Sequence, residues 1–194
     1  MGRSFANLHI KSNNLEKTIE ALKDLSEKDA NVIGRSPENE SIEPQVIMYV
    51  SSSNEKWISV LHDYFVWGTV KKIGKALSRH TEEPVMTVGY MNEEIFELSV
   101  FESGDIQAER IFCEPWTRSE YELKEARLQD DYLQEALDIH PVDFGNLISM
   151  TSPEQAVDKL SELLGMSIWG DAEWIPYEEE LRNRFRKYEF DVTS

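Results

Sequence analysis

The chain is short of cysteine, since Cys113 is the only one in 194 residues. A single thiol cannot form an internal disulfide, so a disulfide-stapled secreted scaffold is excluded and a reducing compartment is indicated. A nucleophilic cysteine needs a neighbouring histidine or a helix N-terminus, and the sequence shows neither beside Cys113. We therefore expect Cys113 to be a plain buried or half-buried thiol.

Histidine is equally sparse. The four histidines are His9, His62, His80 and His140, and none lies within four residues of another. Zinc sites need ligands at short, regular spacings, so no local zinc pattern exists. The nearest approach, Asp138-x-His140-x-x-Asp143, is interrupted by Pro141 and is interpreted as the end of a helix. We expect the purified protein to carry no transition metal and no cofactor.

Long apolar runs are missing, so the sequence predicts no membrane span. The N-terminus lacks the apolar region of a secretory signal. Ala6 stands where a myristoylation signal needs Ser or Thr. These features predict a cytoplasmic protein without membrane association.

Basic side chains are few against acidic ones, 20 against 37, which gives a formal net charge of −17. Residues 1–112 carry a net charge of −6, and the shorter stretch 113–194 carries −11. Such a charge repels nucleic-acid phosphates and anionic lipids, so neither is an expected partner. A basic protein would instead be attracted and steered toward the chain.

What the sequence has in quantity is apolar and aromatic material, 40% and 10% of the residues. A chain of this length and composition can bury a core as one structural unit, and it is too apolar for disorder. Strand patterns alternate with helix patterns in the first half. The predicted strands are 6–11, 46–50, 57–64, 85–90, 95–101 and 106–112, and the predicted helices are 14–25 and 69–79.

This order predicts an α+β fold: a ferredoxin-like βαββαβ core extended by antiparallel strands and followed by a helical C-terminal part. We expect residues 1–112 to form one mixed or antiparallel sheet with two helices on a single face, and residues 113–194 to form the acidic helical part packed on it. The predicted C-terminal helices are 119–137, introduced by the pair Ser119 and Glu122, then 153–164, then a last helix from 176 to 187. Residues 26–44 are predicted to be a long loop.

The stretch Gly68–Lys75 superficially resembles a phosphate-binding loop. Five residues separate its glycines where that loop needs four, and Ala76 follows where a hydroxyl is required. We therefore reject it. Lys71, Lys72 and Lys75 are interpreted as the solvated face of a helix, with pairing to the acidic C-terminal part as the alternative.

Aromatic residues gather in the most acidic stretch of the chain. Tyrosine, tryptophan and charge together are typical of protein interfaces, although aromatics that merely dock the last helix are the commoner case. We take the acidic residues around helix 119–137 and the stretch 169–180 as the candidate contact surface. The candidate partner-binding residues are Asp130, Asp131, Glu135, Trp169, Asp171, Trp174 and Glu178.

With no catalytic pattern in the sequence, the leading hypothesis is a non-enzymatic, acidic cytosolic interaction module, for instance an immunity or antitoxin-like protein that covers a basic partner. The alternative is a small-molecule-binding domain, with the ligand on an open sheet face or under the loop 26–44. An enzyme that uses scattered Asp, Glu and His ranks last.

Overall fold

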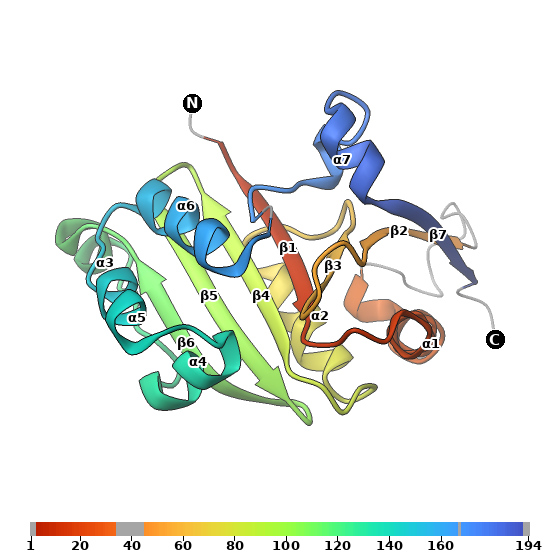
Figure 1. The fold of residues 1–194 in the computed structure, drawn as a ribbon, viewed down its shortest axis with the longest axis horizontal. Coiled ribbons are helices and arrows are strands. Elements are labelled where there is room, and N and C mark those ends of the chain that lie inside the picture. The colour runs from red at the N-terminus through yellow and green to blue at the C-terminus, as the bar shows by residue number, and fades with distance from the viewer. Residues whose placement is uncertain (1–2, 34–44, 167, 192–194) are drawn as a thin grey trace.

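A seven-stranded antiparallel sheet organises the chain (Figure 1). The computed structural model describes residues 3–33, 45–166 and 168–191. The strand order across the sheet is β6-β5-β4-β1-β3-β2-β7, so the last strand of the chain forms one edge. The strands are β1 (Phe5–Ile10), β2 (Gln45–Ser51), β3 (Ile58–Leu61), β4 (Val85–Met91), β5 (Ile95–Glu102), β6 (Asp105–Phe112) and β7 (Arg186–Asp191).

Helices are placed between and after these strands. The α-helices are α1 (Leu15–Lys28), α2 (Thr69–Leu77), α3 (Pro115–Glu120), α4 (Asp130–Leu137), α5 (Pro141–Ile148), α6 (Pro153–Leu164) and α7 (Glu179–Arg184), with 3₁₀ turns η1 (Ala30–Ile33) and η2 (Ala172–Trp174). None of the helices in the described ranges is both long and apolar enough to cross a membrane.

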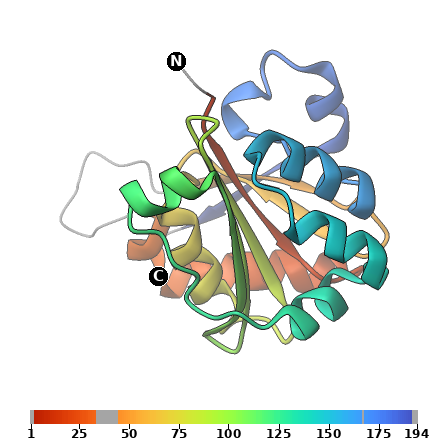
Figure 2. The ribbon, with the colours of Figure 1, turned by 90° about the vertical axis from the view of Figure 1, so that its left-hand side faces the viewer.

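Helices α1 and α2 cover one face of the sheet, as the sequence predicts (Figure 2). Successive strand residues point to opposite faces, and Leu8 and Ile10 of β1 point toward these helices. Leu22 and Leu25 of α1 and Ile73 of α2 fall at helical spacing and meet them in one buried cluster.

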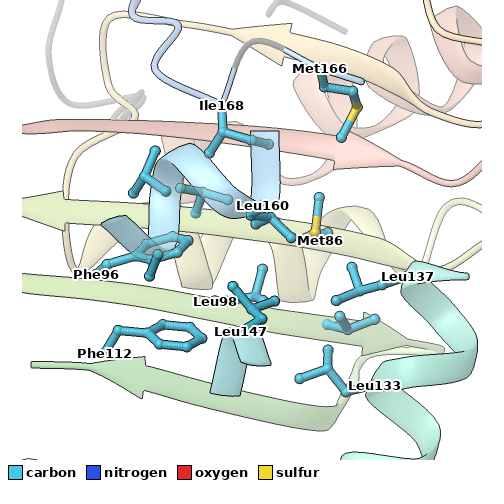
Figure 3. Close-up of a cluster of buried hydrophobic side chains, with 14 of the residues drawn as sticks. Met86, Phe96, Leu98, Phe112, Leu133, Leu137, Leu147, Leu160, Met166 and Ile168 are labelled. Atoms are coloured by element: carbon cyan, nitrogen blue, oxygen red, sulfur yellow. The ribbon is translucent and has the colours of Figure 1, made fainter. Parts of the chain in front are cut away.

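The opposite face is covered by α4, α5 and α6 (Figure 3). Met86, Phe96, Leu98 and Phe112 rise from three neighbouring strands into this second core. They pack against apolar side chains of the three helices and of the following segment, namely Leu133, Leu137, Leu147, Leu160, Met166 and Ile168. The inner strands of the sheet are thus buried on both faces.

The best-marked helix of the sequence is confirmed. The Oγ of Ser152 accepts a hydrogen bond from the backbone N–H of Gln155 at 3.3 Å, and Pro153 occupies the first turn. Gly165 ends α6 at φ +64°, in the left-handed region that glycine adopts without a steric penalty.

The predicted continuous helix 119–137 is wrong. Helix α3 ends at Glu120, and Glu122 takes a left-handed φ of +52° that no helix tolerates. The next residues lie along the edge strand β6 instead, where the N–H of Glu109 donates to the carbonyl of Arg127 at 2.9 Å. Residues 121–127 therefore cover an otherwise unpaired edge, and α4 begins only at Asp130.

Two further boundaries differ from the sequence prediction. Pro141 does not end a helix; it starts α5, and His140 caps that helix by accepting the N–H of Val142 at 3.2 Å. The last predicted helix, 176–187, is only the short α7, after which β7 pairs with β2. Tyr188 and Phe190 face α1 on this strand, so burial of alternate aromatics overrides the helical charge pattern.

The predicted loop 26–44 is helical in its first part, because α1 runs to Lys28 and η1 covers Ala30–Ile33. Residues 34–44 lie outside the described residues.

Two glycines test how closely the helices approach the sheet. A Cβ at Gly74 of α2 would lie 2.2 Å from Cγ2 of Thr87, a buried, β-branched residue of β4. We expect Gly74→Ala to destabilise the fold by about 2–3 kcal/mol through overpacking. Gly145 of α5 has nothing within 4 Å, so Gly145→Ala should stabilise by about 0.5–1 kcal/mol through helix propensity. Urea unfolding of both variants measures the change in unfolding free energy. Equal changes for the two substitutions would contradict this packing of α2 on β4.

Candidate partner-binding surface

The acidic residues of α4 have two different roles. Asp130 is engaged by Arg110 of β6 through two hydrogen bonds, one of 2.9 Å from Nε to Oδ1. Such a bidentate pair fixes the start of α4 against the sheet, so Asp130 belongs to the fold. Asp131 and Glu135 are exposed and are available to a partner.

Trp169 is largely used by the protein itself. Its ring lies 5.3 Å from the Phe5 ring and 5.2 Å from the Tyr90 ring, and its indole N–H donates to Asp158 at 2.7 Å. These contacts tie Trp169 to β1, β4 and α6, and they do not dock the last helix. Trp169 therefore packs within the fold next to the candidate contact surface.

Arg3 completes the aromatic cluster, and the sequence analysis missed it. Its guanidinium carbon lies 5.4, 5.3 and 5.1 Å from the ring centres of Phe5, Trp169 and Trp174. Nη2 also donates to the carbonyl of Trp169 at 2.8 Å. The quadrupoles of the three rings attract the Arg3 cation. This part of the protein therefore already binds one guanidinium group, that of its own Arg3.

Next to Arg3, the segment 171–180 exposes aromatic and acidic side chains to solvent. Trp174 is 39% exposed and Tyr177 is 78% exposed. The ten residues contain five acids and no base. Asp171 caps η2 by accepting the N–H of Glu173 at 3.1 Å, and Glu178 occupies the N-cap position of α7.

Negative charge is concentrated at this segment. Burial raises the pKa of Asp171, and the neighbouring carboxylates Glu173 and Asp63 raise it further, against the opposing effects of the backbone N–H and Arg3. Asp63 follows β3 and lies far away in sequence, so this acidic surface is assembled by the fold. We call Asp63, Asp171, Glu173, Trp174, Tyr177 and Glu178 the acidic-aromatic surface.

The fold does not bring this surface together with α4. Arg3, before β1, contacts Trp169, whereas Lys11, after β1, donates from Nζ to the carbonyl of Glu135 at 3.4 Å. At about 3.3 Å per residue, the eight steps between Arg3 and Lys11 span roughly 26 Å. The two groups of predicted contact residues therefore lie at opposite ends of the sheet (Figure 1).

A buried polar chain fixes the start of the acidic segment. His9 lies 2.7 Å from Ser59 Oγ through Nδ1 and 2.6 Å from Asn7 Oδ1 through Nε2. Asn7 donates from Nδ2 to the carbonyls of Ile168 and Gly170, at 2.7 and 2.9 Å. Burial lowers the pKa of His9 to about 3, so the imidazole is neutral.

The order serine, histidine, amide matches that of a nucleophile with its base and orienting group. In this protein Ser59, His9 and Asn7 are all buried. The last member of the hydrogen-bond network, Asn7, donates to backbone carbonyls. We therefore assign the network to positioning the segment after α6, because it supplies partners for carbonyls that no strand pairs.

A second buried polar cluster lies beneath α2. Lys71 Nζ lies 2.6 Å from Glu109 Oε2 and 3.7 Å from Glu97 Oε1, and Ser99 Oγ donates to Glu109 at 2.8 Å. Lys71 therefore does not belong to the solvated face, nor does it pair with the acidic C-terminal part. Lys72 and Lys75 are exposed as predicted. The two acids that pair with Lys71 come from the sheet, Glu97 from β5 and Glu109 from β6. Both are buried because this face of β5 and β6 is also covered.

The remaining candidates have structural environments. Cys113 is buried, and burial raises its pKa, partly opposed by Arg118. Within the described ranges no three His, Cys, Asp or Glu side chains are grouped closely enough to hold a metal ion. Helices cover both faces of the sheet over its inner strands, whereas Lys187 and Glu189 of the edge strand β7 are exposed on the face opposite α1.

Comparison of the chain with protein-family models, with curated proteins and with solved structures finds no match.

Glu97 gives the protein a pH-dependent stability. Burial, opposed by Lys71, raises its pKa to about 6 from 4.5. The folded state therefore holds this proton more tightly than the unfolded state, and stability falls as pH rises from about 4.5 to about 6. A shift of this size corresponds to about 2 kcal/mol. We expect Glu97→Gln to be more stable than wild type by up to that amount at pH 7.5, and no more stable at pH 4.

Glu109→Gln is the matched control. Glu109 makes the shorter contact with Lys71 and accepts the N–H of Ala126 at 2.8 Å, so its loss should destabilise at pH 7.5. Urea unfolding at pH 4 and pH 7.5 gives the unfolding free energies of wild type, Glu97→Gln and Glu109→Gln. A Glu97→Gln variant less stable than wild type at pH 7.5 would refute the assignment.

Proposed function

We propose that this protein is a non-enzymatic, acidic cytosolic interaction module that binds a basic protein partner through the acidic-aromatic surface. The observation that carries the proposal is the exposure of Trp174 and Tyr177 within a ten-residue stretch of five acids and no base. An immunity or antitoxin-like protein that covers the basic active face of a nuclease is the concrete form we propose.

The two kinds of side chain on this surface contribute in different ways. Exposed Trp and Tyr bury large area at low entropic cost, and residues of these types dominate measured interface energies. Surrounding carboxylates raise the association rate and lose their effect in salt. Asp131 and Glu135 at the far end add to the long-range field without reaching the same contact.

The cluster around Arg3 supports the choice of a basic partner. Three aromatic rings already hold one guanidinium there, and Trp174 keeps part of its surface open beside it. A partner's arginine or lysine would meet the same chemistry at Trp174 and Tyr177, with carboxylates close by.

We also propose that the first four strands form a ferredoxin-like core within a single structural unit. The chain order β1-α1-β2-β3-α2-β4 and the spatial order β4-β1-β3-β2 support it. Strands β5, β6 and β7 extend this core at its two edges.

The test begins with capture of partners from native cytosol at about 0.1 M and about 1 M salt, between which the Debye length falls from about 10 to about 3 Å. Binding of the captured basic protein is then measured with Trp174→Ala and Tyr177→Ala. Each should weaken binding by about tenfold or more, as interface anchors do. Val142→Ala, on the exposed surface of α5, is the control and should bind like wild type.

Charge is tested with two double variants that remove the same number of acids. Glu173→Gln with Glu178→Gln should slow association several-fold, whereas Asp131→Asn with Glu135→Gln should have a smaller effect. Asp130 is left intact because its pair with Arg110 holds the fold. A partner indifferent to salt and to both aromatic changes would refute the proposal.

A further inference from the structure

One hollow of this acidic protein is lined by arginines, and none of the described residues that line it is an acid. It has a cavity volume of about 530 Å³ and lies between the start of α1, the turn after β2 and the junction of α7 with β7. Arg182, Arg184 and Arg186 line it, together with Ser52, Leu15 and Tyr188 among others. In a chain of net charge −17, a groove with this lining is a local positive site.

The junction of α7 with β7 explains why the arginines converge. Phe185 leaves the helix in an extended conformation, and the chain enters the strand at Arg186. Arg186 is paired with Val50 across the ladder, and Val50 points toward α1. The Arg186 side chain therefore emerges on the α1 side of the sheet, toward the groove.

Much of the donor capacity of these arginines is unused. Within the described part of the chain, the Arg186 side chain has no hydrogen bond or ion pair. Arg184 forms an ion pair with Glu180, 2.9 Å away, in an exposed pair of the kind that contributes little. Arg182 is positioned by the carbonyls of Pro176 and Ile175, which accept from Nη1 at 2.6 and 3.4 Å, and among the described residues its Nε and Nη2 have no partner.

Two further features favour an anion with an apolar body. Leu15 is the first residue of the 14-residue helix α1, whose N-terminus carries partial positive charge. Leu15, Val50 and Tyr188 add an apolar wall beside the arginines. A volume of this size suits a small ligand.

We propose that this groove binds a small organic phosphate, with the phosphate on Arg184 and Arg186 and the apolar body against Tyr188. Arginine suits this ligand because its planar fork pairs with two phosphate oxygens at once. The site is independent of the acidic-aromatic surface, whose charge is opposite and whose partner is a protein.

The experiment is calorimetric titration of the full chain with adenosine 5′-monophosphate and with inorganic phosphate. Wild type should bind the nucleotide with a Kd below about 1 mM and more tightly than phosphate, because only the nucleotide reaches the apolar wall. Arg186→Gln should weaken nucleotide binding by about tenfold, the loss of one charge-assisted contact. Tyr188→Leu should weaken nucleotide binding while leaving phosphate binding unchanged.

Lys187→Gln is the matched control. It removes the same charge one residue away, but Lys187 is paired with Tyr49 and points to the opposite face of the sheet. It should bind like wild type, and the melting temperatures of all variants identify any that fail to fold. No saturable nucleotide binding, equal loss in Arg186→Gln and Lys187→Gln, or equal affinity for nucleotide and phosphate would each overturn the proposal.

Discussion

Burial of both faces of the sheet is the constraint on which the rest of this structure depends. Helices α1 and α2 cover one face and α4, α5 and α6 the other, so polar side chains on the inner strands must find partners inside the protein. Asn7 and His9 meet this requirement by binding backbone carbonyls and Ser59. Glu97 and Glu109 meet it through Lys71. Both clusters have the residue types of catalytic sites, and both are explained by the need to satisfy buried polar groups.

The same constraint places the acidity on the outside. Bases from the first half of the chain contact the C-terminal part: Arg3 lies against Trp169, Lys56 pairs with Asp138, and Arg110 pairs with Asp130. Each of these contacts places a positive charge beneath an acidic segment. The bases that make these contacts are not the lysines of α2, since Lys71 pairs with Glu97 and Glu109 and Lys72 and Lys75 are exposed. The carboxylates left over face solvent, which concentrates negative charge where a partner can reach it.

The sequence predicts local structure well where the local signal agrees with burial. The caps of α6 are an example. The sequence-based prediction fails where a contact with a residue distant in sequence determines the local structure. Ser119 and Glu122 have capping-box spacing, but the edge of β6 needs cover, and residues 121–127 supply it. Glu97 and Ser99 look like the solvent side of a strand, since nothing local shows that α2 lies above them. The strand β7 did have a signal, Tyr188 and Phe190 alternating with Lys187 and Glu189, which the helical charge pattern obscured.

For the candidate contact surface, the structure changes which of the residues expected from the sequence are exposed together. Trp174 is exposed and Glu178 half-buried on the surface, whereas Asp130 and Trp169 contact other parts of the fold. Tyr177 lies within the expected stretch 169–180, but Arg3 and Asp63 could not be assigned without knowing which strand ends meet. Pairing of β7 with β2 has a second consequence, because it holds the arginines of 182–186 immediately after the acids of 171–180. One pair joins the two groups, because Arg184 contacts Glu180, whereas Arg186 is carried onto the α1 side of the sheet by its pairing with Val50. The two proposals made above, a protein at the acidic-aromatic surface and a small anion in the arginine groove, both depend on this division of charge.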